Sequence, residues 1–333
     1  TEMAAPNELL GSILKDVSRS FYLTLRVLPR SVRTQIGLAY LLARTTDTIA
    51  DTNLVPWKER VERLRQFRER IRYTDALPVD FSDLAQGQDN PAEHRLLELS
   101  HETLEMLDAM APEDRGQIQL LLETITRGQE LDLRRFGDGN TLTALQTAVE
   151  LEDYTYHVAG CVGEFWTRLT RKHCFPEAQL DDDEFLAKSA RFGRGLQLVN
   201  VLRDLPRDLR NGRCYLPADE LEAANLQPTD LLNPNVWSKL KPIYNHWMRA
   251  AHTHLSAGWR YTNTVPFGQY RLRLACAWPI LLGGKTLDKL SVANPMQLEP
   301  RIKATRGEVR SILWRSVWRL PFRGAWENLF TPA

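Results

Sequence analysis

The sequence of 333 residues predicts an all-α protein. Apolar residues recur with the period of helices through most of the chain, whereas alternating, strand-like runs bounded by hairpin turns are hard to find. Polar breaks that carry Pro or Gly separate the helical stretches and leave room for helices of about three to seven turns. These breaks lie at 73–93, 136–141, 174–183, 209–217, 225–235, 262–268 and 293–299.

The breaks do not divide the chain into separate domains. None has the composition of a flexible Gly/Ser linker, and no repeat of roughly 20–50 residues is visible. We therefore expect one helical domain over 1–333, in which 306–333 is a basic, aromatic C-terminal segment. Helical bundles of this kind build ligand sites between facing helices.

Composition narrows the functional classes. Hydrophobic residues make up 43% and charged residues 26% of the chain, as in soluble globular proteins. The balance of 43 basic and 42 acidic residues argues against a general nucleic-acid binder. The four cysteines form no CxxC pair, no apolar run is long enough to span a membrane, and the first ten residues lack a signal-peptide pattern. We expect a cytoplasmic protein.

A polar stripe marks the apolar run GLAYLLARTTDTIAD at 37–51. Tyr40, Arg44, Asp47 and Asp51 follow one another at spacings of four, three and four, which puts them on one helix face. Two carboxylates four residues apart repel each other, so this face is unfavourable unless a cation or a basic group joins it. The alternative is a solvated face on which Arg44 pairs with an aspartate.

A second polar strip lies on a helix that is otherwise rich in Leu and Val. Within GRGLQLVNVLRDLPRD at 193–208, the strip consists of Gln197, Asn200, Asp204 and Asp208, with Arg203 beside it. Buried amides and carboxylates need partners or a metal ion. If the two helices face each other, they offer four carboxylates and no His or Cys, which suits Mg²⁺ shared with the phosphates of a substrate. The implied substrate is a diphosphate.

Two neighbouring features qualify the second strip. Pro206 lies inside the strip, so we expect the helix to kink or end there. A kink would turn Asp208 away from Asp204, which makes Asp208 the least certain metal ligand of the four aspartates. Arg213 follows in a turn, where it either holds phosphate oxygens or is an ordinary surface arginine. The acidic run at 181–183 is interpreted as the first turn of a helix, because consecutive side chains cannot converge on a metal.

Four blocks of this sequence resemble the squalene and phytoene synthase family, the head-to-head prenyl synthases. They are SRSFYLTLRVLP at 18–29, YLLARTTDTIAD at 40–51, YTYHVAGCVGEFWTRL at 154–169 and QLVNVLRDLPRDLRNGRCYLP at 197–217, with a weaker block, CAWPILLGG, at 276–284. The blocks follow the family's order.

The resemblance implies an isoprenoid synthase fold around a central hydrophobic cavity. It implies that Asp47, Asp51, Asp204 and Asp208 bind Mg²⁺ and, through it, the substrate diphosphates. Residues that match positions around the diphosphates are Ser18, Ser20, Tyr40, Arg44, Gln197, Asn200, Arg203 and Arg213. In squalene synthases some of these positions also belong to the reductant site.

The implied reaction joins two farnesyl diphosphates. One ionises, its C1 cation is captured by the alkene of the other, and loss of a proton gives presqualene diphosphate. A second ionisation follows, ended either by hydride from NADPH, which gives squalene, or by loss of a proton, which gives dehydrosqualene or phytoene. The stretch CAWP at 276–279 resembles the CAIP of squalene synthases and favours the reduced product. Alternatives are a presqualene diphosphate synthase and, in another class, a non-catalytic helical protein that binds a partner.

The residue that handles the proton is open. Squalene synthases carry a tyrosine just before VAG, where this chain has His157, whereas dehydrosqualene and phytoene synthases place a tyrosine one step earlier, as Tyr156 does here. Tyr154 is a further candidate, and each tyrosine is alternatively a packed aromatic. His157 is either part of the site or an imidazole paired to the backbone. In the same block, Gly160 and Gly163 permit either a close helix contact or room for the prenyl chain.

The C-terminal segment has two interpretations. It combines arginines with Trp314, Trp318, Phe322, Trp326 and Phe330. These aromatics either pack onto the domain or form an interfacial surface that makes a peripheral membrane contact.

Overall fold

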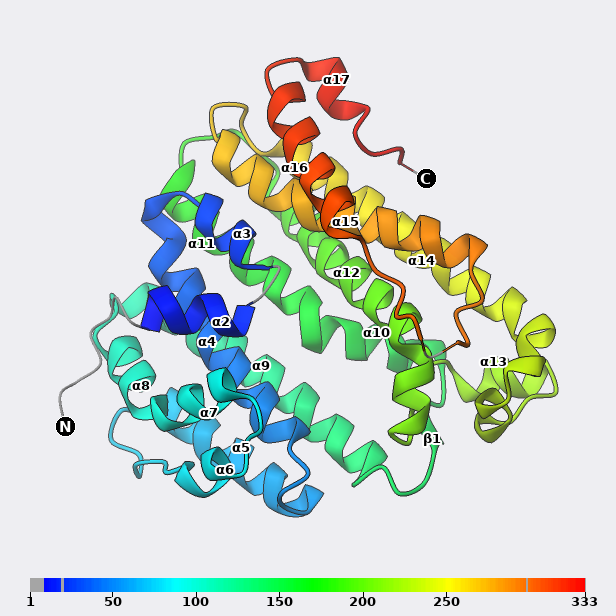
Figure 1. Ribbon diagram of the computed structural model, residues 1–333. Helices are drawn as coiled ribbons and strands as arrows, with labels where there is room; N and C mark the ends of the chain where they lie inside the picture. Colours follow the sequence, from blue (N-terminus) through cyan, green and yellow to red (C-terminus); the bar gives the residue numbers. More distant parts are fainter. Residues whose placement is uncertain (1–8, 19–20, 298, 333) are drawn as a thin grey trace. The chain divides into compact units, whose positions relative to one another are not determined.

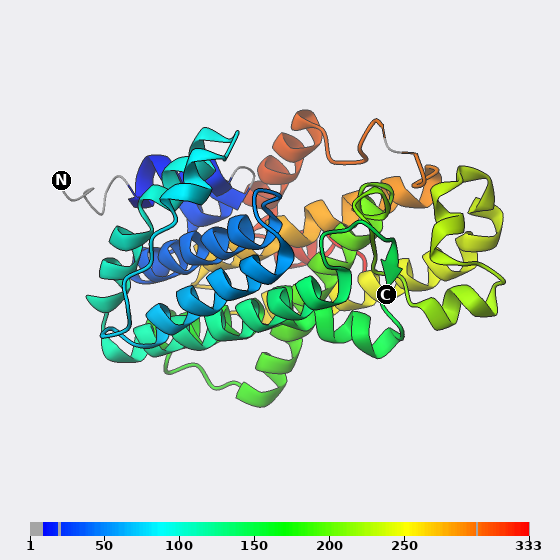
Figure 2. The same cartoon turned by 90° about the horizontal axis from the view of Figure 1, so that it is seen from below.

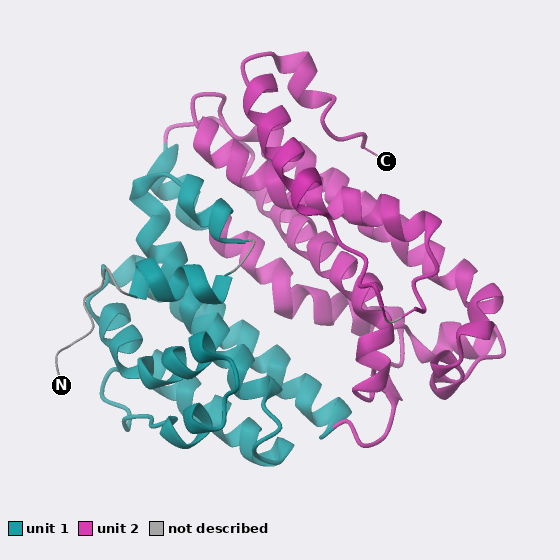
Figure 3. Ribbon diagram, viewed as in Figure 1, with its two compact units in different colours: residues 1–138, 168–176 teal, residues 139–167, 177–333 magenta. Residues whose placement is uncertain are grey.

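The computed structural model describes residues 9–18, 21–297 and 299–332 and confirms the all-α class (Figure 1). Ser20, a predicted diphosphate-binding residue, and most of the N-terminal stretch lie outside the described residues. The chain forms two compact units, coloured separately in Figure 3: residues 1–138 with 168–176, and residues 139–167 with 177–333. That the whole chain is one domain stays a prediction.

Unit 1 consists of helices alone within the described residues. They are η1 (Leu9–Ile13), α2 (Leu14–Ser18), α3 (Tyr22–Val27), α4 (Arg30–Asp51), α5 (Trp57–Arg72), α6 (Ser82–Gln86), α7 (Pro91–Glu98), α8 (Ser100–Asp108), α9 (Pro112–Phe136) and the second half of α11 (Cys161–Cys174). The long helices α4, α5 and α9 pack against one another. Each begins next to a proline, which suits the first turn because its missing N–H has no partner there.

The apolar face of α4 is the centre of unit 1. The side chains of Ile36, Leu41, Leu42 and Ile49 are at most 5% exposed. The hydroxyl of Thr45, which lies between them, donates a hydrogen bond to the backbone carbonyl of Leu41. This burial holds the opposite, polar face of the same helix in a fixed orientation. The expected stripe from Tyr40 to Asp51 therefore lies on one unbroken helix.

Unit 2 contains the remaining elements. They are β1 (Thr143–Ala144), α10 (Ala148–Thr155), the π-helix η3 (Tyr156–Gly160), the first half of α11, α12 (Asp182–Arg210), β2 (Arg213–Cys214), α13 (Ala218–Ala223), η4 (Pro228–Leu232), η5 (Pro234–Val236), α14 (Trp237–Thr264), α15 (Tyr270–Val292), α16 (Arg306–Arg319) and α17 (Arg323–Glu327). The two short strands pair in parallel. Helix α14 runs beside α12 and α15 (Figure 2).

Helix α12 begins as the sequence predicts and ends later than expected. The side chain of Asp181 accepts a hydrogen bond from the backbone N–H of Glu184 (3.0 Å), and Asp182 and Asp183 lie in the first turn. The acidic run is thus an N-terminal cap, as interpreted. The expectation that the helix could end at Pro206 is wrong, because α12 continues to Arg210.

Small residues bring the backbones of two segments of unit 2 into contact. A Cβ atom on Gly163 would lie 2.0 Å from the carbonyl oxygen of Ser189, and one on Gly193 would lie 2.0 Å from that of Ala159. Both distances are far inside van der Waals contact. Of the two roles considered for Gly163, the structure shows close helix packing.

We predict that Gly163→Ala destabilises the protein by about 1–3 kcal/mol, because backbone atoms cannot yield to the added methyl group. Gly116→Ala is the matched control, since nothing lies within 4 Å of a Cβ at this exposed position of α9. It should be neutral or stabilise by up to about 1 kcal/mol. Urea unfolding of both variants measures the difference, and equal stabilities would contradict the proposed contact.

Candidate active site

The polar stripe of α4 is tied to two other helices of unit 1. Arg44 donates a hydrogen bond from Nη2 to Oε1 of Glu93 in α7, and its Nη1 lies 3.9 Å from Oδ2 of Asp47. Gln129 of α9 donates from Nε2 to Oδ1 of Asp47 (2.7 Å) and to Thr46 (3.0 Å). The stripe is therefore a network of buried and half-buried polar groups, in which Arg44 pairs with a glutamate as well as with the neighbouring aspartate.

Asp47 carries the strongest electrostatic perturbation of this network. Burial of its carboxyl group and repulsion from Asp51 raise its pKa to about 7, although Arg44 and Gln129 work in the opposite direction. About half of the side-chain surface (48%) still reaches solvent. One arginine thus fails to balance the acidic charges, and the face retains a need for positive charge.

Glu93 and Gln129 belong to this network, and sequence reasoning missed both. Glu93 adds to the repulsion on Asp47, and Gln129 presents a buried Oε1 without a hydrogen-bond partner among the described residues. Neither residue stands at a helical spacing from the aspartates. In the sequence, the one feature that could have indicated a role for them is that they are polar residues in helices whose other positions include buried apolar residues.

Ser18 and Tyr40 lie at the beginning of the same region. Ser18 is buried, and its hydroxyl has no hydrogen-bond partner in the part of the chain that the structure describes. The hydroxyl of Tyr40 donates to the carbonyl of Val17 (3.4 Å), and its ring stacks on Phe21 at 5.4 Å. Tyr40 of α4 therefore contacts α2 at the residue that precedes Ser18.

The polar strip of α12 begins with a chain of amides and a tyrosine. Asn200 donates to Oε1 of Gln197 (3.2 Å), and Gln197 donates to the hydroxyl of Tyr154 in α10 (3.1 Å). The ring of Tyr154 stacks on Tyr215 at 4.3 Å. These contacts bring three of the predicted site residues together within unit 2.

Asp204 is held by two arginines. Its Oδ1 accepts from Nε of Arg203 (3.1 Å) and of Arg301 (2.8 Å), and its Oδ2 accepts from Nη2 of both (2.6 Å each). Burial opposes the negative charge of Asp204, but these hydrogen bonds outweigh it, and its pKa lies below the ordinary value. Arg301, in the segment between α15 and α16, is a residue that sequence reasoning missed, because only the fold brings it to α12.

Asp208 and Arg213 lie beyond Asp204, toward the end of α12. Both are partly buried, and Arg213 belongs to strand β2. Burial raises the pKa of the neighbouring Cys214 to about 12, and the negative charge of Asp208 contributes to that increase. Asp208 therefore remains on the same helix as Asp204, one turn further.

The candidate proton-handling residues occupy an irregular segment. Tyr156 and His157 lie in the π-helix η3, a form that occurs often at functional sites. The hydroxyl of Tyr156 donates to Oε2 of Glu164 (3.3 Å), and Arg194 lies over its ring at 5.4 Å. His157 Nδ1 lies 2.9 Å from the carbonyl oxygen of Asp153, the arrangement described by the backbone-pairing alternative.

The donors fit Mg²⁺ differently in the two units. Among the described residues, no group of three or more His, Cys, Asp or Glu side chains is arranged to hold a metal ion. Mg²⁺ often takes only one or two carboxylates, with phosphates and water completing its shell. The negative charge around Asp47 and Asp51 exceeds the nearby positive charge, so these carboxylates could bind such an ion. The carboxylate of Asp204 could bind one only if the guanidinium of Arg301 no longer occupies its oxygens. A magnesium site shared by both faces stays a prediction.

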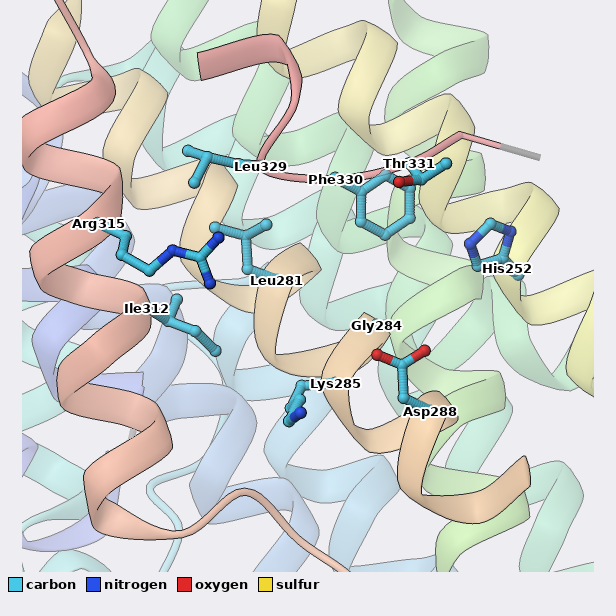
Figure 4. Close-up of a pocket in the computed structure, with 10 residues that line it drawn as sticks. All are labelled: His252, Leu281, Gly284, Lys285, Asp288, Ile312, Arg315, Leu329, Phe330 and Thr331. Atoms are coloured by element: carbon cyan, nitrogen blue, oxygen red, sulfur yellow. The ribbon is translucent and has the colours of Figure 1, made fainter. Parts of the chain in front are cut away.

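A separate pocket of about 280 Å³ lies within unit 2 and contains none of the predicted site residues. Figure 4 shows its lining residues, which come from α14, α15, α16 and the C-terminal tail: His252, Leu281, Gly284, Lys285, Asp288, Ile312, Arg315, Leu329, Phe330 and Thr331. It belongs to the packing of the C-terminal segment.

Each unit thus carries an Asp-x-x-x-Asp sequence on a long helix, on α4 in unit 1 and on α12 in unit 2. The family model described as squalene/phytoene synthase matches residues 14–308, and the chain belongs to that family. This confirms the resemblance drawn from the four sequence blocks.

Its curated relatives have different products. Squalene synthase of Saccharomyces cerevisiae is 27% identical over 91% of this chain and 66% of its own length. Presqualene diphosphate synthase of Rhodopseudomonas palustris is 29% identical over 74% of this chain and 75% of its own. The chain spans less than two thirds of the first squalene synthases it matches, with 63% for the Gibberella zeae enzyme.

Solved structures confirm the isoprenoid synthase fold. A structure of TcSQS with a bound ligand superimposes with a TM-score of 0.77 at 21% identity, covering 94% of this chain and 86% of that one. A dehydrosqualene synthase in complex with a ligand gives a TM-score of 0.69 at 19% identity, covering 95% and 96%. In the described residues, no helix combines the length and hydropathy required to cross a bilayer.

We predict that Asp47→Asn raises the thermal stability in EDTA. The carboxyl group of Asp47 binds its proton more tightly in the folded than in the unfolded chain, so stability is lost as pH rises from about 4 toward 7. The amide removes that loss, and the gain in Tm should therefore be larger at pH 8 than at pH 5. Differential scanning fluorimetry measures it, with the exposed Asp75→Asn as the control. A lower Tm at pH 8 would contradict the repulsion.

Proposed function

We propose that this protein is a head-to-head prenyl synthase that joins two farnesyl diphosphates and forms squalene through presqualene diphosphate. The observation that carries the proposal is the charge-coupled Asp-x-x-x-Asp face of α4, in a chain that belongs to the squalene/phytoene synthase family. An aspartate whose pKa is raised to about 7 beside a second carboxylate is suited to a site completed by a cation.

The aspartates are assigned to metal binding. Asp47 and Asp51 in unit 1 and Asp204 and Asp208 in unit 2 would hold Mg²⁺, which supplies positive charge to the departing diphosphate when it is bound. The residues assigned to the diphosphate oxygens are Ser18, Ser20, Tyr40, Arg44, Gln197, Asn200, Arg203 and Arg213. Arg44 and Arg203 are already charge-assisted donors in their networks, so they can exchange a carboxylate for a phosphate.

We assign the proton of the first half-reaction to the segment around η3. Closing the cyclopropane ring releases one proton, and Tyr156 can accept it only if its own proton moves to a neighbour. Glu164, which accepts the hydrogen bond from Tyr156, provides that neighbour. Tyr154 and His157 remain alternatives, Tyr154 through its contact with Gln197.

A second candidate is a presqualene diphosphate synthase, which stops after the first half-reaction. The relative from Rhodopseudomonas palustris favours it, because its identity and the covered share of its length (29% and 75%) both exceed those of the yeast squalene synthase (27% and 66%). Dehydrosqualene and phytoene synthases differ from both in their products and would need no NADPH. A non-catalytic partner-binding protein would show no turnover at all.

Product analysis tests the proposal. Purified protein is incubated with farnesyl diphosphate and Mg²⁺, with and without NADPH, and the products are identified by mass spectrometry. We expect squalene only with NADPH, and at least a 100-fold loss of turnover in Asp47→Ala but not in Asp75→Ala. Product without reductant would indicate dehydrosqualene, accumulated presqualene diphosphate would indicate the second candidate, and geranylgeranyl diphosphate as the better substrate would indicate phytoene. Full turnover in Asp47→Ala would contradict the role of the α4 face.

We further predict that Arg301→Gln tightens Mg²⁺ binding by roughly tenfold. In the wild-type protein, Mg²⁺ must displace the guanidinium of Arg301 from Asp204, and the loss of this charge-assisted pair costs about 1.5 kcal/mol of binding free energy, which the variant avoids. Isothermal titration calorimetry without substrate measures the affinity. Arg306→Gln, at the exposed start of α16, is the control. Unchanged or weaker Mg²⁺ binding in Arg301→Gln would show that Asp204 is not a ligand that the arginine covers.

A further inference from the structure

Four large apolar side chains are exposed near the end of α16. Trp314 is 66% exposed, Val317 48%, Trp318 59% and Phe322 64%. Trp314, Val317 and Trp318 are three and four residues apart and share one side of the helix, and the two indoles contact each other at 5.4 Å. We call these four residues the aromatic face.

The opposite side of α16 is attached to the rest of unit 2. The hydroxyl of Ser316 is buried and accepts a hydrogen bond from the indole of Trp278 in α15 (2.9 Å). Figure 4 shows Ile312 and Arg315 of α16 lining the pocket beside α15. The helix is therefore fixed, and its aromatic face is presented outward.

The remaining aromatics of the segment are not part of this face. Trp326 is 1% exposed and stacks on Trp259 at 5.5 Å, and Phe330 is 7% exposed and stacks on His252 at 5.3 Å. The packing interpretation is thus confirmed for Trp326 and Phe330, and the membrane interpretation stays a prediction for the exposed residues. Packing accounts for Trp326 and Phe330, whereas it leaves the aromatic face uncovered.

The charge around the aromatic face is predominantly positive. The segment carries five arginines, at 306, 310, 315, 319 and 323, and only two acidic residues. Both acids are paired: Glu308 with Lys289 at 2.6 Å, and Glu327 with Arg323 at 3.0 Å. A second copy of the chain would bring the same excess of arginines to the interface, so self-association through this face is electrostatically unfavourable.

We propose that the aromatic face docks onto an anionic lipid bilayer, with α16 lying in the plane of the membrane surface. Tryptophan is enriched at membrane–water interfaces, because its ring is apolar and its N–H can remain hydrated. Each arginine near an anionic surface adds about 1 kcal/mol of attraction. A 14-residue helix fixed along one side suits such an interfacial position. The proposal does not depend on the enzymatic activity.

Vesicle sedimentation tests this docking. The full protein is mixed with vesicles of phosphatidylcholine alone or with 30% phosphatidylglycerol, at low and high salt. We expect binding to the anionic vesicles that weakens with salt, and at least a tenfold weaker binding in Trp314→Ser/Trp318→Ser. Tyr270→Ser, at a position 54% exposed on α15, is the matched control and should bind normally.

Two further measurements complete the test. Arg306→Glu/Arg310→Glu, at exposed positions eight and four residues before Trp314, should lose binding to the anionic vesicles, and circular dichroism should show that every variant keeps its helical content and Tm. Light scattering after gel filtration measures the oligomeric state. The proposal would be overturned if the wild-type protein did not sediment with anionic vesicles. It would also be overturned if the wild-type protein were a dimer that dissociates in Trp314→Ser/Trp318→Ser.

Discussion

The constraint on which the candidate site depends is the repulsion between carboxylates that helix packing holds in place. The apolar sides of α4 and α12 are buried, so the carboxylates of each helix keep a fixed position relative to one another. Each unit resolves the repulsion in its own way. Unit 1 opposes its acids with Arg44 and the amide of Gln129, whereas unit 2 surrounds Asp204 with two guanidinium groups.

This difference gives the two acidic faces different chemistry. The pKa of Asp47 is raised to about 7, so at neutral pH its carboxyl group is only partly ionised until positive charge arrives. The pKa of Asp204 is lowered, and its oxygens already carry four hydrogen bonds. A cation would therefore gain immediately from the first face, but would have to replace a guanidinium at the second. If diphosphate accepts the displaced Arg301, metal and substrate favour each other's binding.

Local patterns in the sequence predicted the parts of the molecule that local physics decides. Helical periodicity gave the all-α fold and the shared face of Tyr40 to Asp51, and the acidic run at 181–183 indicated a helix start. Long-range contacts were not accessible in this way: Glu93, Gln129 and Arg301 reach the aspartates only through folding. Of the two outcomes expected at Pro206, an end of the helix is wrong, because α12 continues to Arg210 and packs against α14 and α15.

The acidic faces alone cannot determine the product. Squalene, presqualene diphosphate and phytoene synthases are all among the relatives of this chain, and these enzymes are named for different products. The proposed role of the aspartates, to bind a metal ion and through it a diphosphate, would be the same in each of these reactions. The choice must depend on groups that handle protons and hydride after ionisation. In unit 2, the irregular segment η3 places Tyr156 beside the carboxylate of Glu164, whereas Tyr154 accepts a hydrogen bond from the amide of Gln197 and stacks on Tyr215. The surroundings of the two tyrosines therefore differ in charge, and the carboxylate beside Tyr156 is the difference that bears on proton transfer.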